Sequence, residues 1–410
     1  MKILFINHFP LTGSGSGVYT CNLAKSMSAK GHECAIIFPD NRKEYEKYEG
    51  IKQYPVFFKD KETIYGVNQV KFNFPCFTTH PRSTFAFNDL TDEQWEEYLE
   101  IFHKKINEAI DEFKPDIVHA QHVWVLAGIS ARCCKEKGIP MVVTCHGTDL
   151  LGIKDEKERG RCRGILLAEE AADYSFKIIS ISTDNTVVMK DLLHQYSDKF
   201  VIIRNGADSS VFYQDNTIKK EEVLSHLGVS KGCEKVVCFV GKLTPMKNVE
   251  ALLKAAVYYE ETNVVTLIAG DGELREKLED MSKKLGLKNI VFLGNQPHDV
   301  LKNIYNIADC SLILSKREAF GLVAIEAMMC GAPLIASNHG ALPEFVTEDV
   351  GILVDSDNPK MIAESVQSIL KDDKKFDRHH ISKTITVKFS QDSIIEEFIH
   401  VYEKAINNKS

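Results

Sequence analysis

The chain has 410 residues, which is long enough for two substantial domains that each bury a core of their own. Its formal net charge is −8 and no long Lys/Arg block is present, which argues against a protein that binds nucleic acid by neutralising phosphates. Eleven cysteines, an odd number without a C-x-x-C pair or regular zinc spacing, indicate reduced thiols in a cytoplasm and suggest no metal site.

The N-terminal residues predict a buried strand. The run MKILFINHF is too short and too soon interrupted for a signal peptide. No apolar run reaches the ~18 residues needed to span a bilayer, so we expect membrane association to be peripheral at most.

Apolar, strand-like runs alternate with helical segments in the first half, which is the βαβ pattern of a parallel sheet. The series opens with a strand at 2–7, a helix at 17–30 and a strand at 34–38. Further strands are predicted at 117–119, 141–144, 178–181 and 201–203.

A loop rich in glycine and serine, residues 12–17, follows the first predicted strand and opens a helix. Its small residues permit close backbone approach to a diphosphate or an acceptor, and Ser16 and Gly17 are the candidate contacts. The loop lacks the dinucleotide order G-x-G-x-x-G, and only Asp40 is an evident acidic residue at the tip of the second strand. Binding of NAD therefore remains the alternative interpretation.

Residues 51–90 do not follow the βαβ rhythm and predict a long ordered excursion. They contain seven phenylalanines together with His80 and Arg82. Such excursions often carry binding functions, so we place ligand recognition here, with His80 and Arg82 as contacts. The alternative is a satellite hydrophobic cluster under a loop.

The segment His146-Gly-Thr-Asp149 follows the strand predicted at 141–144, where α/β proteins bind ligands outside the carboxyl ends of parallel strands. His146 is either a ligand-contacting imidazole or a hydrogen-bonded structural histidine. Thr148 and Asp149 are further candidate ligand contacts.

The alternation resumes after a polar, turn-rich stretch at 205–232, which is the predicted junction between two Rossmann-like domains. The last segment, 392–406, carries apolar residues at helical spacing and predicts an amphipathic helix. Strands of the second domain are predicted at 236–240, 264–268, 290–293, 310–314 and 333–336.

Two lysines, Lys242 and Lys247, lie in the loop that follows the strand predicted at 236–240. Two cations at this spacing can hold one diphosphate between them. Lysines in loops are ordinarily solvated surface residues, but a loop that follows a buried strand makes that alternative less favoured here.

Glu318 and Glu326 flank a predicted helix start near Leu322. The unpaired N–H groups of that start suit a phosphate oxygen, and Gly321 lets the ligand approach the backbone closely. A carboxylate accepts hydrogen bonds from neighbouring hydroxyls, so the pair matches a sugar at one end and a ribose at the other, and the implied ligand is a nucleotide sugar. Taken alone, the pair could be a helix N-terminal glutamate beside a surface glutamate.

The block from Glu318 to Glu344 resembles the signature of the retaining glycosyltransferases of family 4, which have the GT-B architecture. The loop at 241–248 and the linker at 205–212 are also similar to family motifs, although Lys242 stands where the family usually has arginine. The resemblance implies an α/β GT-B fold of two Rossmann-like domains with a deep interdomain cleft. It places the acceptor-binding domain at 1–205, the nucleotide-sugar-binding domain at 206–385, and a C-terminal helix returning to the first domain at 386–410.

The resemblance further implies an enzyme that moves a hexose or N-acetylhexosamine from a UDP- or GDP-linked sugar to a hydroxyl acceptor, with retention of configuration, in polysaccharide or glycoconjugate biosynthesis. The acceptor would be a sugar, a lipid-linked sugar or a small metabolite. No metal ion or other cofactor is implied, and no D-x-D pair positioned for a divalent ion is evident. A phosphorolytic or epimerising GT-B relative and a binding protein without activity remain alternatives, and the oligomeric state is left open.

The catalytic residues that the resemblance implies are His146, which contacts the donor sugar, Glu318, which holds sugar hydroxyls, and Lys247, which meets the diphosphate. Backbone groups near Gly294 and Asn295 would read the base, and Glu326 would hold the ribose. The implied donor-binding residues are Gly17, Lys242, Lys247, Gly294, Asn295, Glu318, Phe320, Gly321, Leu322, Val323 and Glu326. The acceptor-binding candidates are Ser16, His80, Arg82, Thr148 and Asp149.

Overall fold

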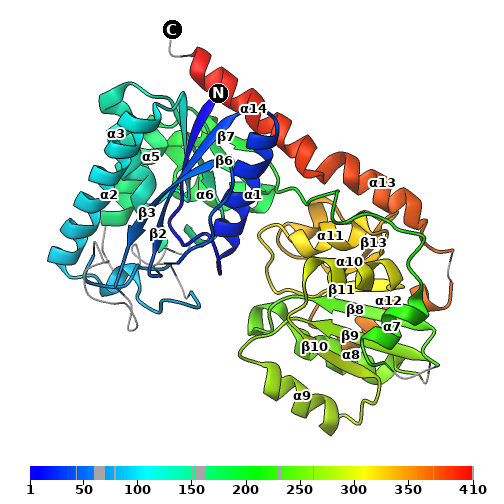
Figure 1. Cartoon of the computed structure of the whole chain (residues 1–410). Coiled ribbons are helices and arrows are strands. Elements are labelled where there is room, and N and C mark those ends of the chain that lie inside the picture. The colour runs from blue at the N-terminus through cyan, green and yellow to red at the C-terminus, as the bar shows by residue number, and fades with distance from the viewer. Residues whose placement is uncertain are drawn as a thin grey trace. The chain divides into compact units, whose positions relative to one another are not determined.

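The chain forms two compact α/β units (Figure 1). The first unit consists of residues 1–203 and the residues from 395 onward, and the second consists of residues 204–394. The chain therefore leaves the first unit once and returns to it at its C-terminal end. The computed structural model describes residues 1–42, 44–59, 70–77, 80–149, 152–153, 163–229, 232–261, 263–372 and 374–408.

A seven-stranded parallel sheet forms the centre of the first unit, with the order β3-β2-β1-β4-β5-β6-β7. The direction in which strands are added reverses between β1 and β4. Such a reversal is a topological switch point, where the loops after two neighbouring strands diverge and leave room for a ligand. The strands are β1 (Lys2–Ile6), β2 (Glu33–Asp40), β3 (Ile51–Phe57), β4 (Ile117–Gln121), β5 (Met141–Cys145), β6 (Ile178–Ser180) and β7 (Phe200–Ile202).

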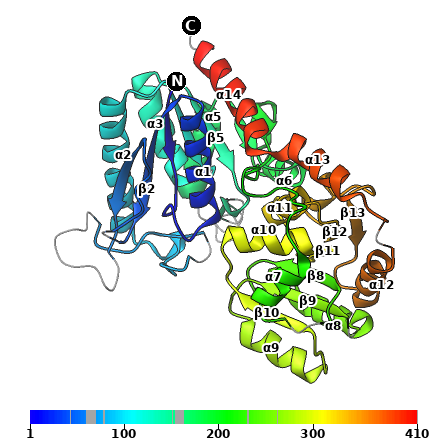
Figure 2. The same cartoon turned by 45° about the vertical axis from the view of Figure 1, so that its right-hand side comes forward.

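Helices cover the faces of this sheet, because strands of a parallel sheet are apolar on both sides. Figure 2 shows α2 and α3 side by side on one face and α1 on the other. The helices of the first unit are α1 (Gly15–Ala29), α2 (Asp92–Phe113), α3 (Val125–Lys137), α5 (Arg163–Tyr174) and α6 (Thr183–Leu192), with the 3₁₀-helices η1 (Phe87–Asp89) and η2 (His194–Lys199).

The phenylalanine-rich segment begins with a strand that the sequence analysis did not predict. Among the described strands, β2 is the one partner of β3, and this edge position tolerates Pro55. Residues 60–69 and 78–79 of the segment lie outside the described part of the chain. Several of its rings lie in the core of the first unit, so they form the hydrophobic cluster that was the alternative to a binding loop. These buried rings are Phe58, Phe72, Phe74 and Phe87.

The second unit is built on a six-stranded parallel sheet with the order β10-β9-β8-β11-β12-β13. Its switch point lies between β8 and β11. The strands are β8 (Lys235–Val240), β9 (Val264–Ala269), β10 (Ile290–Gly294), β11 (Cys310–Ile313), β12 (Leu334–Ser337) and β13 (Gly351–Val354). The helices are α7 (Lys220–His226), α8 (Val249–Tyr259), α9 (Arg275–Lys284), α10 (His298–Ile307), α11 (Leu322–Met329), α12 (Pro359–Leu370) and α13 (Arg378–Phe389), with η3 (Pro245–Lys247) and η4 (Leu342–Glu344).

The last helix, α14 (Gln391–Asn407), belongs to the first unit from Ile395 onward. The Tyr402 hydroxyl and His119 Nδ1 of β4 share a hydrogen bond of 2.6 Å, and both side chains are fully buried. The other imidazole nitrogen of His119 bonds the Thr144 hydroxyl of β5 at 2.7 Å. This chain of polar contacts ties the C-terminal helix to two central strands. Among the described helices, none combines the length and the apolar character that crossing a membrane requires.

We expect Tyr402→Phe to lower the free energy of unfolding of the first unit by about 2 kcal/mol, because it leaves a buried imidazole nitrogen without its partner. Both tryptophans of the chain, Trp95 and Trp124, lie in the first unit, so tryptophan fluorescence during denaturation reports on this unit. As a control in the same unit, Val187→Ala on the exposed side of α6 should leave the transition unchanged. Equal midpoints for wild type and Tyr402→Phe would show that this contact contributes nothing.

Candidate active site

The switch point of the second unit brings together the loops after β8 and β11. Lys247 ends η3 in the first loop, and Glu318 lies in the second. The Lys247 ammonium donates to Glu318 Oε2 at 2.6 Å, and the Ser315 hydroxyl donates to the same oxygen at 2.9 Å. The fold thus joins two candidate residues that lie 71 positions apart in the sequence.

The backbone of Glu318 is held by the loop that follows β12. The Ala341 N–H donates to the Glu318 carbonyl at 2.9 Å. Gly340 has a φ of +64°, and a Cβ at this position would lie 2.4 Å from the Glu318 carbonyl oxygen. Because a backbone atom cannot give way as a flexible side chain can, only glycine fits there, and the carboxylate of Glu318 has a fixed support.

Helix α11 begins at Leu322, as the sequence predicted, and Gly321 precedes it with a φ of +98°. The N–H groups of Leu322 and Val323 have no acceptor within the helix, as at every helix start, and no side chain caps this end. A Cβ on Gly321 would lie 3.2 Å from Glu318 Cγ, so the helix start and the carboxylate are neighbours. The positive end of the helix dipole suits an anion of phosphate size.

Phe320 anchors the same loop in the core. Its ring is buried and packs against Phe345 at 5.6 Å and Phe389 at 6.0 Å between ring centroids. Any contact of this residue with a ligand would therefore come from its backbone.

Glu326 lies one turn inside α11. Burial raises the pKa of its carboxyl to about 7, and the Tyr305 hydroxyl of α10 opposes part of that shift. The group therefore changes its charge near neutral pH.

The C-terminal end of α11 is held by α13. The Arg378 guanidinium donates to the Cys330 carbonyl, and the Ser382 hydroxyl donates to the Met329 carbonyl at 2.6 Å. The same guanidinium donates to the last turn of α10, which places one cation at the carbonyl ends of two helices, where the dipoles favour it. Its acceptors there are the carbonyls of Tyr305, Asn306 and Ala308, at 3.3, 2.8 and 2.6 Å.

The other donor-binding candidates of the second unit follow β8 and β10. Lys242 and Asn295 are exposed. Gly294 has a φ of +70°, and its carbonyl accepts from the Gly270 N–H at 2.7 Å. No hydrogen bond or ion pair between described residues joins these candidates to Lys247 or Glu318, so their contact with one shared ligand stays a prediction.

In the first unit, His146 follows β5 and is half-buried. Its Nε2 bonds Gln121 Oε1 at 2.8 Å. Its ring lies 5.0 Å from that of Tyr19 and 4.8 Å from that of His122, measured between centroids. Burial lowers the pKa of His146 to about 3, so the imidazole is neutral at physiological pH and offers one donor and one acceptor.

Asp149 is fully buried and shapes the loop that carries His146. Its carboxylate accepts from the Val123 N–H at 3.0 Å, the Gly147 N–H at 2.8 Å and the Cys145 thiol at 3.2 Å. These contacts give the carboxylate a structural role in holding the loop. Its contact with an acceptor stays a prediction. Thr148 beside it is half-buried.

The packing at the start of α1 explains why residue 17 is a glycine. The Ser14 hydroxyl caps the helix by accepting from the Gly17 N–H at 3.0 Å and donates to the Pro10 carbonyl at 3.1 Å. A Cβ on Gly17 would lie 2.2 Å from that carbonyl oxygen, so the glycine is needed for packing whether or not a ligand binds here. Ser16 is buried, and its carbonyl accepts from the Thr20 hydroxyl at 2.7 Å.

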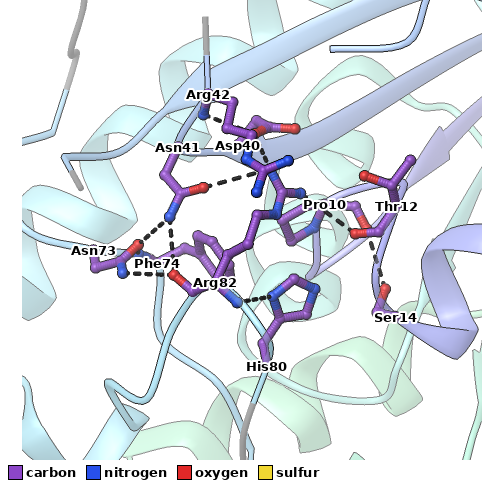
Figure 3. Close-up of polar contacts among 10 residues, drawn as sticks. All are labelled: Pro10, Thr12, Ser14, Asp40, Asn41, Arg42, Asn73, Phe74, His80 and Arg82. Atoms are coloured by element: carbon purple, nitrogen blue, oxygen red, sulfur yellow. Dashed lines mark hydrogen bonds and ion pairs between the residues drawn. The ribbon is translucent and has the colours of Figure 1, made fainter. Parts of the chain in front are cut away.

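Arg82 is committed to an ion pair with Asp40 at the end of β2, as Figure 3 shows. Its Nη1 donates to Asp40 Oδ1 at 2.7 Å, and both side chains are less than a tenth exposed. The Arg82 carbonyl accepts from the amides of Asn41 and Asn73, each at 3.0 Å, and its N–H donates to His80 Nδ1 at 3.1 Å. This network fastens the phenylalanine-rich segment to the sheet, and acceptor contacts of His80 and Arg82 stay predictions.

Two family profiles match successive parts of the chain: Glycosyltransferase Family 4 over residues 13–211 and Glycosyl transferases group 1 over residues 227–385. The chain belongs to glycosyltransferase family 4. An uncharacterized glycosyltransferase of Methanocaldococcus jannaschii is 29% identical to this glycosyltransferase over 427 residues, which cover 99% of each chain. The N-acetyl-alpha-D-glucosaminyl L-malate synthase of Bacillus anthracis is 26% identical over 405 residues, 97% of this chain and 95% of the relative.

Solved structures show the fold of this glycosyltransferase. The crystal structure of HepE of Anabaena in complex with UDP matches it with a TM-score of 0.72 and 16% identity, over 98% of this chain and 100% of that one. The prediction of a GT-B fold is thereby confirmed.

The sequence analysis overlooked several residues that the fold of this glycosyltransferase places beside its candidates. Ser315 directs the carboxylate of Glu318, and Tyr19, Gln121 and His122 surround His146. A usable signal was present, because Gln121 ends β4 and His122 follows it directly, at the carboxyl end of a strand.

Proposed function

We propose that this glycosyltransferase moves a hexose or N-acetylhexosamine from a UDP- or GDP-linked sugar to a hydroxyl acceptor with retention of configuration. The observation that carries the proposal is the Lys247–Glu318 pair beside the open start of α11. A cation, a carboxylate and unpaired helix N–H groups together match a diphosphate joined to a sugar.

The charge that develops during the reaction explains why these groups belong together. As the bond between sugar and diphosphate lengthens, negative charge grows on the diphosphate. Lys247 and the N–H groups of Leu322 and Val323 stabilise that charge more in the transition state than in the ground state. Glu318, now paired with Lys247, would exchange this partner for hydroxyls of the sugar when the diphosphate takes up the ammonium.

The other candidates complete the donor site in this proposal. Lys242 adds a second cation, Glu326 accepts from the ribose hydroxyls, and backbone groups near Gly294 and Asn295 contact the base. His146 of the first unit contacts the donor sugar. UDP as the donor nucleotide is supported by the complex of HepE of Anabaena with UDP.

A thermal-shift experiment with UDP, GDP and their sugar conjugates tests donor binding. A ligand at 100 times its dissociation constant stabilises the fold by about 2.7 kcal/mol, which corresponds to a rise in Tm of roughly 5–10 °C for units of this size. We expect this rise for one nucleotide series and none for NAD. A rise with NAD alone would instead support the dinucleotide interpretation of the loop at 12–17.

Retention and independence of metal ions are tested once a donor is known. Proton NMR of the first-formed product gives its anomeric configuration, which should equal that of the donor. The rate should be unchanged by EDTA, because lysine side chains and helix N–H groups meet the diphosphate charge in this proposal. An inverted product or a rate abolished by EDTA contradicts the respective part.

The pKa of Glu326 predicts a pH dependence of donor affinity. Because the folded-state pKa is raised to about 7, the carboxyl is neutral below that pH and ionised above it. Only the ionised form offers acceptors to both ribose hydroxyls, so UDP should bind up to about tenfold more tightly at pH 8 than at pH 6. Calorimetric titration measures this ratio, which should fall to near one in Glu326→Gln.

The same shift affects stability with the opposite sign. The unfolded carboxyl loses its proton at its lower ordinary pKa, whereas the folded one keeps it until about pH 7. The contribution of Glu326 to stability therefore declines as pH rises over this interval. Glu326→Gln should lack this decline, and an identical pH profile of Tm in both proteins would contradict the assignment.

A further inference from the structure

Three side chains that the proposed function does not use surround His146. Tyr19 comes from α1, which follows β1, whereas Gln121 and His122 lie at the end of β4. β1 and β4 are the two strands that flank the switch point of the first sheet. The His146 cluster, made of Tyr19, Gln121, His122 and His146, therefore lies where a parallel sheet leaves room for a ligand.

In the described structure, Tyr19, Gln121 and His122 each have a buried polar atom without a hydrogen-bond partner. These atoms are the Tyr19 hydroxyl oxygen, Gln121 Nε2 and His122 Nδ1. Rotating the Gln121 amide by 180° does not remove the deficit, since only one of its two polar atoms meets His146. A neighbouring imidazole, His8, is fully bonded: its Nδ1 lies 3.2 Å from the Gln121 carbonyl and its Nε2 accepts from the Leu126 N–H at 3.0 Å.

The backbone of His122 is strained. Its φ of +71° lies in the left-handed region, which costs a residue with a side chain roughly 1–2 kcal/mol. Its ring is held between the rings of Phe9, Phe77 and His146 at centroid distances of 5.4, 5.1 and 4.8 Å. Packing therefore fixes an unfavourable backbone together with an unpaired nitrogen, a combination that concentrates at functional sites.

The neutral charge of the His146 cluster indicates which kind of ligand it can bind. Burial lowers the pKa of His8 and His146 to about 3 and that of His122 well below its ordinary value, so these rings are neutral. The nearby Asp149 is occupied by protein donors. The described cluster thus offers amide, hydroxyl and imidazole groups and no cation for a phosphate or carboxylate.

We propose that the His146 cluster binds the hydroxyl groups of an uncharged sugar or polyol, with Tyr19, Gln121 and His122 as binding residues. A sugar hydroxyl donates one hydrogen bond and accepts others, which matches a phenol, an amide and a neutral imidazole set side by side. The inference rests on the proposed function, because it names the part of the substrate that this unit recognises.

Two variants remove two of the three unpaired polar atoms and leave an aromatic ring at each position. Tyr19→Phe deletes one oxygen, and His122→Phe replaces the imidazole with an apolar ring in an aromatic surrounding. Since the Tyr19 hydroxyl has no protein partner, Tyr19→Phe should keep the Tm of wild type. His122→Phe places a larger ring in a packed site, so its Tm is measured beside its binding, and Tyr19→Phe decides the test if His122→Phe is destabilised. The matched control is Tyr174→Phe, whose hydroxyl donates to the Ile139 carbonyl at 2.8 Å away from the cluster.

Two binding experiments show whether the hydroxyl groups belong to the donor sugar or to the acceptor. The first compares UDP-glucose, UDP-N-acetylglucosamine and GDP-mannose with UDP and GDP by calorimetric titration. The second follows D-glucose, D-galactose and myo-inositol by saturation-transfer NMR. We expect Tyr19→Phe and His122→Phe each to weaken the sugar-dependent part of binding in one experiment about tenfold, whereas Tyr174→Phe should match wild type. A loss in the first experiment assigns the cluster to the donor sugar, and a loss in the second assigns it to the acceptor.

Failure of the site and failure of the proposed function give different results. If the wild type binds UDP, GDP or their conjugates and both variants bind every probe equally well, the site is overturned and the proposed function stands. If the wild type binds none of these nucleotides, the proposed function fails and the experiment with neutral sugars alone decides the site. A wild type that ignores the neutral sugars as well overturns both.

Discussion

Replacing Lys247 with methionine is expected to reduce kcat/KM for glycosyl transfer by about 10³-fold. Methionine keeps an apolar stem of similar length and removes the ammonium that lies 2.6 Å from Glu318. Deleting one donor that is aimed at developing charge typically costs 10²–10³-fold, and a full positive charge opposite a diphosphate places Lys247 at the upper end. The rate of nucleoside diphosphate release under single-turnover conditions measures the effect.

Two further lysine variants serve as controls. Lys247→Arg retains the charge and should recover a substantial part of the activity, while a different donor geometry keeps it below wild type. Lys277→Met removes a lysine whose exposed ion pair with Glu250 lies outside the candidate site, and it should leave activity unchanged. If Lys247→Met retained wild-type activity, the diphosphate could not lie where we propose.

Replacing Arg378 with methionine is expected to lower the free energy of unfolding of the second unit by about 4 kcal/mol. The guanidinium donates to four carbonyls at the ends of α10 and α11, two of them at 2.6 and 2.8 Å. Hydrogen bonds to charged donors contribute roughly 1.5–3 kcal/mol each. The carbonyls that lose their donor add a further cost, because they are left without a hydrogen bond. The corresponding fall in Tm is about 10 °C.

Differential scanning calorimetry is the suitable measurement, because no tryptophan lies in the second unit. Arg275→Met is the matched control, since it removes an arginine with two ion pairs on the partly exposed side of α9 and should cost less than about 1 kcal/mol. Equal transition temperatures for Arg378→Met and wild type would show that the contacts of α13 do not stabilise α11.

The parallel strands were the most predictable part of the fold. Their apolar runs are local, and eleven of the thirteen strands in the described part of the chain have a counterpart among the predicted ones. β3 was missed because Pro55 and its polar neighbours resemble a loop, and only pairing with β2 at the sheet edge makes a strand there. β13 was also missed, although its four residues are apolar and strands equally short were predicted elsewhere in the chain.

The candidate site was predictable only for residues that directly follow a strand of the parallel sheet. A lysine after β8 and a glutamate after β11 could be expected at one edge of a sheet, and their ion pair agrees with that expectation. The commitment of Arg82 to Asp40 could not be foreseen, because the residues lie 42 positions apart and meet only through the path of the intervening segment. The left-handed backbone of His122 likewise depends on packing, since even histidine, which is enriched at positive φ, adopts it at only a small fraction of positions.

The path of the chain has a consequence for how the protein is made. Residues 1–203 leave the ribosome first, but the unit that they form receives the buried side chains of Phe398 and Tyr402 only after residues 204–394 have been synthesised. The second unit is continuous in sequence and can fold while the first still lacks the partner of His119. The half of the protein that begins folding first is therefore completed last.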